Sequence, residues 1–406
     1  MEKRPIRIYP NLIPGLIEAV RITINGQASP AGVLKQCFRK HPNWGARDRR
    51  LVGRLFYDWI RWWRLYQVAL QSSVENPTYD AEKLLSIWCI HQGEKLPPWL
   101  PIESSEQNAI ELKLQQASKL RSLKYSIPDW LDAYGSQHYG EHLWEEQLIS
   151  LNQKAKLVLR VNLKHTTPQK LADKISKKYQ VQCSLLPPEA IVLDKNVSVE
   201  QSEEYKKGAF EIQDFNSQQV AHWLAPQAGE IILDACAGGG GKSLHLASLM
   251  DSQGQVIAED LFPEKLQKLQ KRAQRNRIRN IQTIPSSRAK YAPEVFDRVL
   301  LDVPCSGLGV LRRNPAAKWQ MTPDRIQKIT ALQQELLQKN APRVKINGVV
   351  LYVSCSILTQ ENEEQIQKFL NSPLGQKFIL EKEFIQLPSA SGFDGFYGAL
   401  LKRTTL

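Results

Sequence analysis

The sequence predicts an α/β fold with a doubly wound, mostly parallel sheet, which follows a helical region and a small mixed α/β region. From about residue 210, runs of β-branched residues alternate with amphipathic stretches of helical spacing, as in repeated strand-helix units. A glycine-rich turn follows the first of these runs, and two later runs end in short segments that contain cysteine. Before about residue 125 the apolar residues recur at helical spacing instead.

The chain has 406 residues, a length that predicts several domains. We expect a helical domain at 1–124, a mixed α/β subdomain at 125–209 and the main α/β domain at 210–406. In the subdomain we expect strands at 156–162, near 180–186 and at 190–193, with a helix at 168–178. In the main domain we expect strands at 231–234, 255–260, 281–284, 297–302, 348–354 and 396–402, with helices between them.

An aromatic stripe in the helical domain leaves two interpretations open. It consists of Leu51, Leu55, Trp59, Trp62 and Trp63, and arginines at positions 47, 49, 50, 54, 61 and 64 surround it. Aromatic side chains interleaved with arginines can bind nucleic acid by stacking and by phosphate contacts. A tryptophan-rich helix core with basic flanks explains the same pattern, and we prefer this second interpretation.

The composition favours a polyanionic partner. The formal net charge is +13 and the isoelectric point is near 9.3, a balance that points to nucleic acid first. Basic residues concentrate between Lys265 and Arg279, where we prefer a solvated helix face over a phosphate clamp. No apolar stretch is long enough to cross a bilayer, so we expect no membrane partner.

The cysteines and histidines predict no metal site. Six cysteines, at positions 37, 89, 183, 236, 305 and 355, are scattered without a CxxC pair. His138 and His142 lie one helical turn apart but do not form the HExxH pattern. Free thiols suit a reducing compartment, so we expect a cytoplasmic protein.

The glycine turn Ala237-Gly-Gly-Gly-Gly-Lys242 follows the first predicted strand of the main domain. A phosphate-binding P-loop requires glycine where this chain has Cys236, and a dinucleotide fingerprint requires glycine where it has Ser243 or Leu244. We still expect a nucleoside-bearing cofactor to approach the backbone of this turn, with Asp260 at the end of the next strand accepting its ribose hydroxyls. Glycines needed only for tight packing are the simpler alternative.

Two further strands end in the segments Asp302-Val-Pro-Cys305 and Val353-Ser-Cys355-Ser356. The carboxyl ends of parallel strands meet at one edge of a sheet, so we expect both thiols beside the glycine turn. A thiolate that adds to carbon 6 of cytosine turns the ring into an enamine, whose carbon 5 can attack an electrophilic methyl group. This chemistry also needs a base and a donor near ring nitrogen 3, which a protonated Asp302 could supply. The pattern therefore suits cysteine-dependent methyl transfer to a pyrimidine.

Three segments carry a family resemblance: Asp234–Lys242, Asp302–Pro315 and Ser354–Ser356. Together they resemble the RsmB/Sun family of RNA cytosine-5 methyltransferases, and Leu159–Asn162 and Gln213-Asp214 look like further matches. The resemblance is strong from about residue 125 and weak before it. It implies a Rossmann-like catalytic domain, a small RNA-binding subdomain and a helical NusB-like RNA-binding domain.

The resemblance also implies an activity: methylation of carbon 5 of a cytosine in RNA, with S-adenosylmethionine as cofactor and 16S rRNA of the small ribosomal subunit as substrate. It implies Cys355 as nucleophile, Cys305 as the residue that assists release, and Asp302 between cofactor and base. The residues that it implies for cofactor binding are Cys236, Ala237, Gly238, Gly239, Gly240, Gly241, Lys242, Asp260, Ser287 and Asp302. Those that it implies face RNA are Arg160, Arg312, Arg313 and Lys318. We expect a monomer.

The chain departs from the family pattern at three places. Gly238-Gly239 stands where the family has Ala-Pro, and Ser354 replaces a threonine. After the strand at 281–284 the chain has Ser286 and Ser287, where the family has an acidic residue near the adenine. This missing carboxylate motivates one rival function, an rRNA-binding assembly factor without turnover. The other rival is a nicotinamide oxidoreductase with incidental cysteines, against which the failed dinucleotide fingerprint argues.

Overall fold

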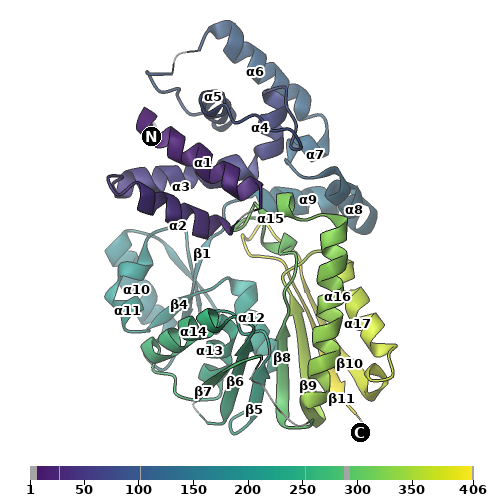
Figure 1. Cartoon of the computed structure of the whole chain (residues 1–406). Helices are drawn as coiled ribbons and strands as arrows, with labels where there is room; N and C mark the ends of the chain where they lie inside the picture. The colour runs from purple at the N-terminus through teal and green to yellow at the C-terminus, as the bar shows by residue number, and fades with distance from the viewer. Residues whose placement is uncertain (1–6, 27, 101, 252, 288–292, 405–406) are drawn as a thin grey trace. The chain divides into compact units, whose positions relative to one another are not determined.

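The computed structural model in Figure 1 describes residues 7–404 apart from 27, 101, 252 and 288–292. Its contacts divide the chain into two compact units. Unit 1 consists of Met1–Asn152 with Leu311–Thr322, and unit 2 consists of Gln153–Val310 with Pro323–Leu406. The domain boundaries expected at residues 124 and 209 stay predictions. None of the helices in the described part of the chain combines the length and apolar character needed to cross a bilayer.

Unit 1 is helical around an aromatic core. Trp59, Trp63 and Trp88 are fully buried in that core, whereas Trp62 is half-buried. The interpretation of the aromatic stripe as a tryptophan-rich helix core is therefore confirmed for Trp59 and Trp63. The helices among its described residues are α1 (Ile13–Ile24), α2 (Pro30–Lys40), α3 (Ala46–Arg61), α4 (Trp63–Ala69), α5 (Ala81–Gln92), α6 (Ser104–Ala117), α7 (Arg121–Lys124), α8 (Asp129–Tyr139), α9 (Glu141–Asn152) and α15 (Ala317–Gln320).

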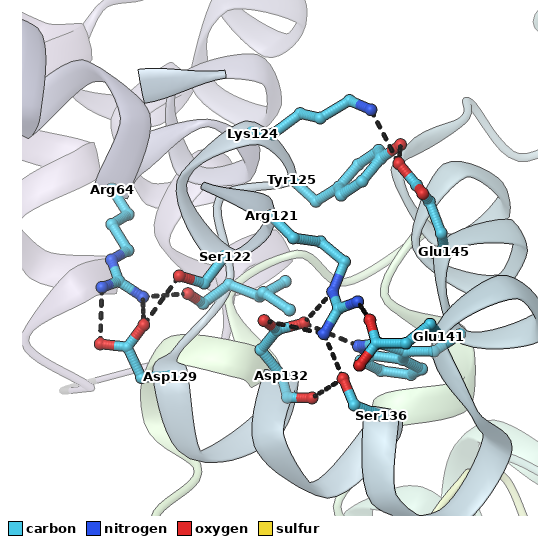
Figure 2. Close-up of polar contacts among 12 residues, drawn as sticks. Arg64, Arg121, Ser122, Lys124, Tyr125, Asp129, Asp132, Ser136, Glu141 and Glu145 are labelled. Carbon is cyan, nitrogen blue, oxygen red and sulfur yellow. Dashed lines mark hydrogen bonds and ion pairs between the residues drawn. The ribbon is translucent and has the colours of Figure 1, made fainter. Parts of the chain in front are cut away.

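Basic side chains of unit 1 are tied to acidic partners on neighbouring helices (Figure 2). Arg64 of α4 forms two hydrogen bonds with the carboxylate of Asp129, at 2.8 and 2.7 Å. Arg121 of α7 contacts Asp132 at 2.7 Å and also Glu141. Bidentate arginine–carboxylate pairs fix geometry as well as charge. Arg64, one of the arginines around the aromatic stripe, thus helps to hold the helices together.

Unit 2 begins with a small antiparallel sheet of strand order β2-β3-β1-β4. Its strands are β1 (Leu157–Val161), β2 (Cys183–Leu186), β3 (Ala190–Leu193) and β4 (Phe210–Ile212), with helices α10 (Pro168–Tyr179) and α11 (Glu203–Lys206). The sequence predicts β1, β2, β3 and α10. It does not predict β4, because a three-residue strand gives no readable alternation.

The main sheet of unit 2 has strand order β10-β11-β9-β8-β5-β6-β7. Its strands are β5 (Ile231–Asp234), β6 (Gln255–Asp260), β7 (Ile281–Pro285), β8 (Phe296–Asp302), β9 (Val344–Ser354), β10 (Phe378–Gln386) and β11 (Phe396–Arg403). Strands β5 to β9 pair in parallel, and β10 and β11 are antiparallel to their neighbours. The predicted doubly wound, mostly parallel sheet is confirmed. Strand β10 is absent from the prediction because charged residues interrupt its apolar pattern.

Two helical layers cover the main sheet (Figure 1). Helices α12 (Phe215–Leu224), α13 (Gly241–Leu249) and α14 (Pro263–Arg275) pack on one face, and α16 (Pro323–Asn340) and α17 (Glu363–Leu370) pack on the other. The chain builds outward from β5 through β6 to β7 and then returns to β8, beside β5. In such sheets ligands bind at the carboxyl ends of the strands, next to this reversal. The glycine turn and both cysteine segments follow strands that end at this edge.

Candidate active site

The two cysteines predicted to carry the chemistry meet at the carboxyl edge of the main sheet. Strand β8 ends at Asp302 and β9 ends at Ser354, and the two strands pair in parallel with Asp302 opposite Val353. The Sγ atoms of Cys305 and Cys355 lie 3.0 Å apart. The backbone N–H of Cys355 also donates to Sγ of Cys305 at 3.4 Å. The expected meeting of two thiols at one strand edge is therefore present.

The surroundings of the two thiols differ. The hydrogen bond to Cys355, burial, and the negative charges of Cys355 and Glu361 raise the pKa of Cys305 well above the usual thiol range. Cys305 is thus held as a thiol that can donate its S–H to Cys355. A thiolate is the nucleophilic form of cysteine, and either sulfur can be the donor of the contact between them. The roles of Cys355 as nucleophile and of Cys305 in release stay predictions.

Lys242 links the glycine turn to Asp302. Its Nζ atom lies 2.6 Å from Oδ2 of Asp302 and 5.2 Å from the ring centroid of Phe396. Burial alone would lower the pKa of Lys242, but the charges of Asp302 and Cys355 raise it above its usual value. The ammonium group therefore lies in the field of the Cys355 sulfur as well as beside Asp302. The sequence predicts Lys242 only as a cofactor residue and gives no sign of Phe396.

Two arginines hold carbonyl groups of the glycine turn. Arg272 of α14 donates to the carbonyl of Gly239 at 2.6 Å, and Arg160 of β1 donates to the carbonyl of Gly241 at 2.7 Å. Arg160 is only 6% exposed. Its guanidinium therefore holds the glycine turn through a hydrogen bond inside the protein. This finding corrects the expectation that Arg160 faces RNA. Arg272 belongs to the basic stretch of α14, which is thus not a solvated face throughout.

Two other residues expected to face RNA are buried in unit 1. Arg312 and Lys318 lie in the segment Leu311–Thr322 and are 2% and 1% exposed. The Nζ atom of Lys318 donates to the carbonyl of Arg61 at 2.8 Å, and burial together with the charge of Arg61 holds the pKa of Lys318 well below its usual range. The expectation is corrected for these two side chains, because neither presents its charge to solvent. Arg313 is half-buried, and its contact with RNA stays a prediction.

The glycine turn has space for a ligand at one glycine and none at another. Gly238 has a φ of +55°, which glycine adopts readily, and no heavy atom lies within 4 Å of the place that a Cβ would occupy. At Gly240, with a φ of +83°, a Cβ would lie 2.3 Å from Leu269. Gly238 thus fits the close approach of a cofactor, whereas Gly240 serves tight packing. The carboxylate of Asp260 accepts the N–H of Gly238 at 2.9 Å, so it lies directly at the open part of the turn.

Cys236 and Ser287 are further predicted cofactor residues, and Asp234, which precedes the turn, is absent from the predicted site. Burial and the charges of Asp234 and Asp302 raise the pKa of Cys236, so this cysteine stays a thiol and offers its backbone rather than a nucleophile. Asp234, fully buried at the end of β5, accepts a hydrogen bond from Ser243 at 2.6 Å, and burial raises its pKa to about 7. Ser287 is exposed in the turn that follows β7.

Two buried residues beside the thiols are absent from the predicted site. Glu361 accepts a hydrogen bond from the hydroxyl of Ser356, and Asn362 accepts one from the hydroxyl of Ser354 at 2.5 Å. Neither residue type by itself indicates a role. The available signal is indirect: Ser354 and Ser356 flank Cys355, and buried hydroxyls need partners.

A second buried cluster joins the small sheet to two helices of the main domain. Oε1 of Glu189, in the turn between β2 and β3, lies 2.8 Å from Nε2 of His222 in α12 and 2.8 Å from Nε2 of His245 in α13. Such a trio can hold a cation. However, of these two histidines only His222 forms a hydrogen bond with this oxygen; Nε2 of His245 lies at the same distance without hydrogen-bond geometry. Burial and the charge of Arg160 lower the pKa of His245. We interpret Glu189, His222 and His245 as a structural contact between the small sheet and the two helices, and we call this contact the clasp. The absence of a metal stays a prediction.

We expect this clasp to make the protein less stable in mild acid. Burial lowers the pKa of His245 to about 3; burial alone would raise the pKa of Glu189, but the two histidines beside it lower it to about 2. Both groups bind protons more readily in the unfolded chain, where their pKa values are 6.5 and 4.5, so unfolding takes up protons. The free energy of unfolding should therefore fall as the pH drops below about 6.5, by at most about 1.4 kcal/mol per pH unit for each proton.

Urea unfolding at a series of pH values measures this dependence. His245→Gln should flatten the slope between about pH 7 and pH 5, because glutamine does not titrate there. His142, whose side chain is 92% exposed, provides the control His142→Gln, which should leave the slope as it is. An equal slope in the wild type and in His245→Gln contradicts the clasp.

Comparison with known proteins identifies the family. The family model of the 16S rRNA methyltransferases RsmB/F matches residues 221–402, and that of the ferredoxin-like domain of RsmF/B-like methyltransferases matches residues 127–200. A probable ribosomal RNA small subunit methyltransferase B of Synechocystis sp. is 36% identical over 300 residues, which cover 69% of this chain and 67% of the relative. The chain belongs to the RsmB/F methyltransferase family.

A further relative extends the sequence likeness over most of the chain, and two solved structures share the fold. The ribosomal RNA small subunit methyltransferase B of Pectobacterium carotovorum is 29% identical over 396 residues, which cover 87% of this chain and 90% of that protein. The crystal structure of PH0851 covers 98% of this chain and is itself covered fully, with a TM-score of 0.79 at 23% identity. NSun6 from Pyrococcus horikoshii with SFG has a TM-score of 0.62 at 18% identity and covers 69% of this chain, with 99% of that protein matched.

These likenesses confirm the Rossmann-like fold. As a member of the RsmB/F family, the chain is an S-adenosylmethionine-dependent RNA methyltransferase. The nicotinamide oxidoreductase is thereby excluded. The comparisons do not favour the assembly factor without turnover, because the named relatives are methyltransferases.

Proposed function

We propose that this member of the RsmB/F family transfers a methyl group to carbon 5 of a cytosine in the rRNA of the small ribosomal subunit. One observation carries the proposal: the thiols of Cys305 and Cys355 lie 3.0 Å apart at the sheet edge that follows the glycine turn. The names of the relatives supply the class of RNA. A monomer in the cytoplasm remains our expectation.

The cofactor fits the open part of the glycine turn. Gly238 leaves open space beside the turn, and its backbone N–H is held by the carboxylate of Asp260. At the end of the turn, Lys242 donates a hydrogen bond to Asp302. The segment Cys236–Lys242, with Asp260 and Ser287, would therefore hold the cofactor. S-adenosylmethionine supplies an electrophilic methyl group when it is bound.

The steps of the reaction divide among three side chains. Sγ of Cys355 forms a bond to carbon 6 of the cytosine, and the electrons of the ring move to carbon 5, which then takes the methyl group. Asp302, held by Lys242, orients the ring. A solvent water takes the proton of carbon 5, and the electrons of that C–H bond restore the double bond between carbons 5 and 6 as the bond from carbon 6 to Cys355 breaks. The S–H of Cys305 stabilises the departing thiolate by a hydrogen bond.

Bisulfite sequencing of RNA from cells with and without this chain tests the proposal. We expect one cytosine of the small-subunit rRNA to lose its protection when the chain is absent. Wild-type protein should restore it, and Cys355→Ala should not. If rRNA is unchanged but another RNA loses its mark, the substrate class is wrong; if no RNA changes and the purified chain methylates none, the function is wrong.

A further inference from the structure

A buried carboxylate lies behind the two cysteine segments. Glu361, in the short 3-10 helix Thr359–Glu361, is 0% exposed. Its Oε1 atom accepts hydrogen bonds from the backbone N–H of Ser306 at 2.8 Å and from the side chain of Gln333 at 3.0 Å. Its Oε2 atom accepts from the hydroxyl of Ser306 at 2.5 Å and from the hydroxyl of Ser356. One carboxylate thus bonds to segments that follow two different strands.

The two serines are the residues directly after the cysteines. Ser306 follows Cys305, Ser356 follows Cys355, and the two hydroxyl oxygens are themselves 3.1 Å apart. Parallel pairing of β8 and β9 ends before either cysteine, at Asp302 opposite Val353. Beyond that point the distance between the two thiols depends on contacts between the segments, and Glu361 supplies several of these.

Burial of a carboxylate behind the two cysteine segments is unfavourable in free energy. A buried charge costs several kcal/mol unless hydrogen bonds compensate it, and Ser306, Gln333 and Ser356, which donate to Glu361, are all neutral. A buried apolar side chain would cost less, but it could not bond to Ser306 and Ser356 at once. The arrangement therefore indicates that the protein needs a carboxylate that bonds to Ser306 and Ser356 together, which we call the bridge.

We propose that Glu361 is a positioning residue of the methyl transfer, which holds the thiols of Cys305 and Cys355 in contact by bridging Ser306 and Ser356. The inference rests on the proposed function for its catalytic consequence, but the bridge itself can be tested without activity. Gln333, which donates to Glu361 and at 3.0 Å to the carbonyl of Pro304, completes the bridge on the side of Cys305.

Three variants test the bridge through activity. Glu361→Ala removes it, Ser306→Ala with Ser356→Ala removes its partners, and Glu361→Gln keeps the shape and most of the hydrogen bonds. We expect kcat to fall about 100-fold in the first two, the cost of a shift of about 1 Å in a reacting group, with KM for rRNA changed less than about threefold. Glu361→Gln should recover most of the rate. Glu364→Gln, an exposed neighbour in α17, is the matched control.

Oxidation by diamide tests the bridge without RNA or cofactor. Two thiols in contact give up two protons and two electrons to diamide and form a disulfide, and diamide becomes the hydrazine. Disulfide formation between Cys305 and Cys355, followed by peptide mass spectrometry, should be fast in the wild type and in Glu361→Gln. It should be at least about tenfold slower when the bridge is removed, as expected if the thiols no longer meet.

The two measurements separate the failure of the bridge from the failure of the function. The bridge is overturned if the wild type methylates RNA and the folded Glu361→Ala variant has the same kcat and the same oxidation rate. Equal loss of kcat in Glu361→Gln and Glu361→Ala also overturns it, because glutamine retains the hydrogen bonds. A wild type without activity, in which oxidation still slows on loss of Glu361, overturns the proposed function and supports the bridge. If Glu361→Ala does not fold, the double serine variant decides.

Discussion

Cys355→Ala is expected to abolish methyl transfer and to leave the folded protein and its cofactor site in place. Carbon 5 of the base becomes reactive only when a sulfur bonds to carbon 6, and the proposed function assigns this bond to Cys355. Cys305, 3.0 Å away, has a strongly raised pKa and cannot replace it readily. Loss of a covalent nucleophile should lower the rate at least about a thousandfold.

Transfer of labelled methyl groups to small-subunit rRNA measures the effect, and calorimetry with S-adenosylmethionine measures the cofactor site. The cofactor dissociation constant should change less than about threefold, because the glycine turn is held by Arg160, Arg272 and Asp260 rather than by Cys355. Cys183→Ala, a half-buried cysteine of the small sheet, is the control and should keep full activity. Activity retained in Cys355→Ala would refute the assigned nucleophile.

The fold could be predicted where the sequence repeats a local pattern. Strands β5, β6, β8 and β9 are apolar runs between helices, and this alternation predicts a mostly parallel sheet. The order of the strands in the sheet comes from the structure. Strand β10 could not be found in the same way, because its exposed edge position permits charged residues at most sites. Strand β4 is too short to show a period.

The meeting of the two cysteines could be predicted because strand ends are local features. Cys305 and Cys355 each follow a readable strand, and topology alone brings such ends together. Glu361 could not be predicted in its role, since its partners Ser306 and Gln333 lie far from it in the sequence and only packing brings them near.

The residues expected to face RNA show what charge alone does not reveal. Arg160 and Lys318 are basic and close to motif residues in sequence, yet each donates to a backbone carbonyl inside the protein. A basic residue that satisfies a buried carbonyl and one that awaits a phosphate look alike in a sequence. Lys318 is buried because the segment Leu311–Thr322 packs within unit 1, and no local sequence pattern predicts that packing.

Cys305→Ala is expected to trap the protein on its RNA. Addition of Cys355 to carbon 6 does not require Cys305, but the departure of the thiolate benefits from the S–H hydrogen bond across the 3.0 Å contact. Without that donor, addition and methyl transfer proceed and release stalls. A covalent adduct of protein and methylated RNA should therefore accumulate, and turnover should fall at least about 100-fold, as when a general acid or base is lost.

Denaturing gels with labelled rRNA detect this adduct, since only a covalent bond survives the denaturant. The adduct should be absent from Cys305→Ala combined with Cys355→Ala, because the double variant has no nucleophile. Cys305→Ser, which keeps a hydrogen-bond donor at the same place, should accumulate less adduct than Cys305→Ala. If instead Cys305→Ala forms no adduct and Cys355→Ala forms one, the two sulfurs have the opposite roles: Cys305 then attacks carbon 6, and the strongly raised pKa of its thiol must fall when RNA enters the site.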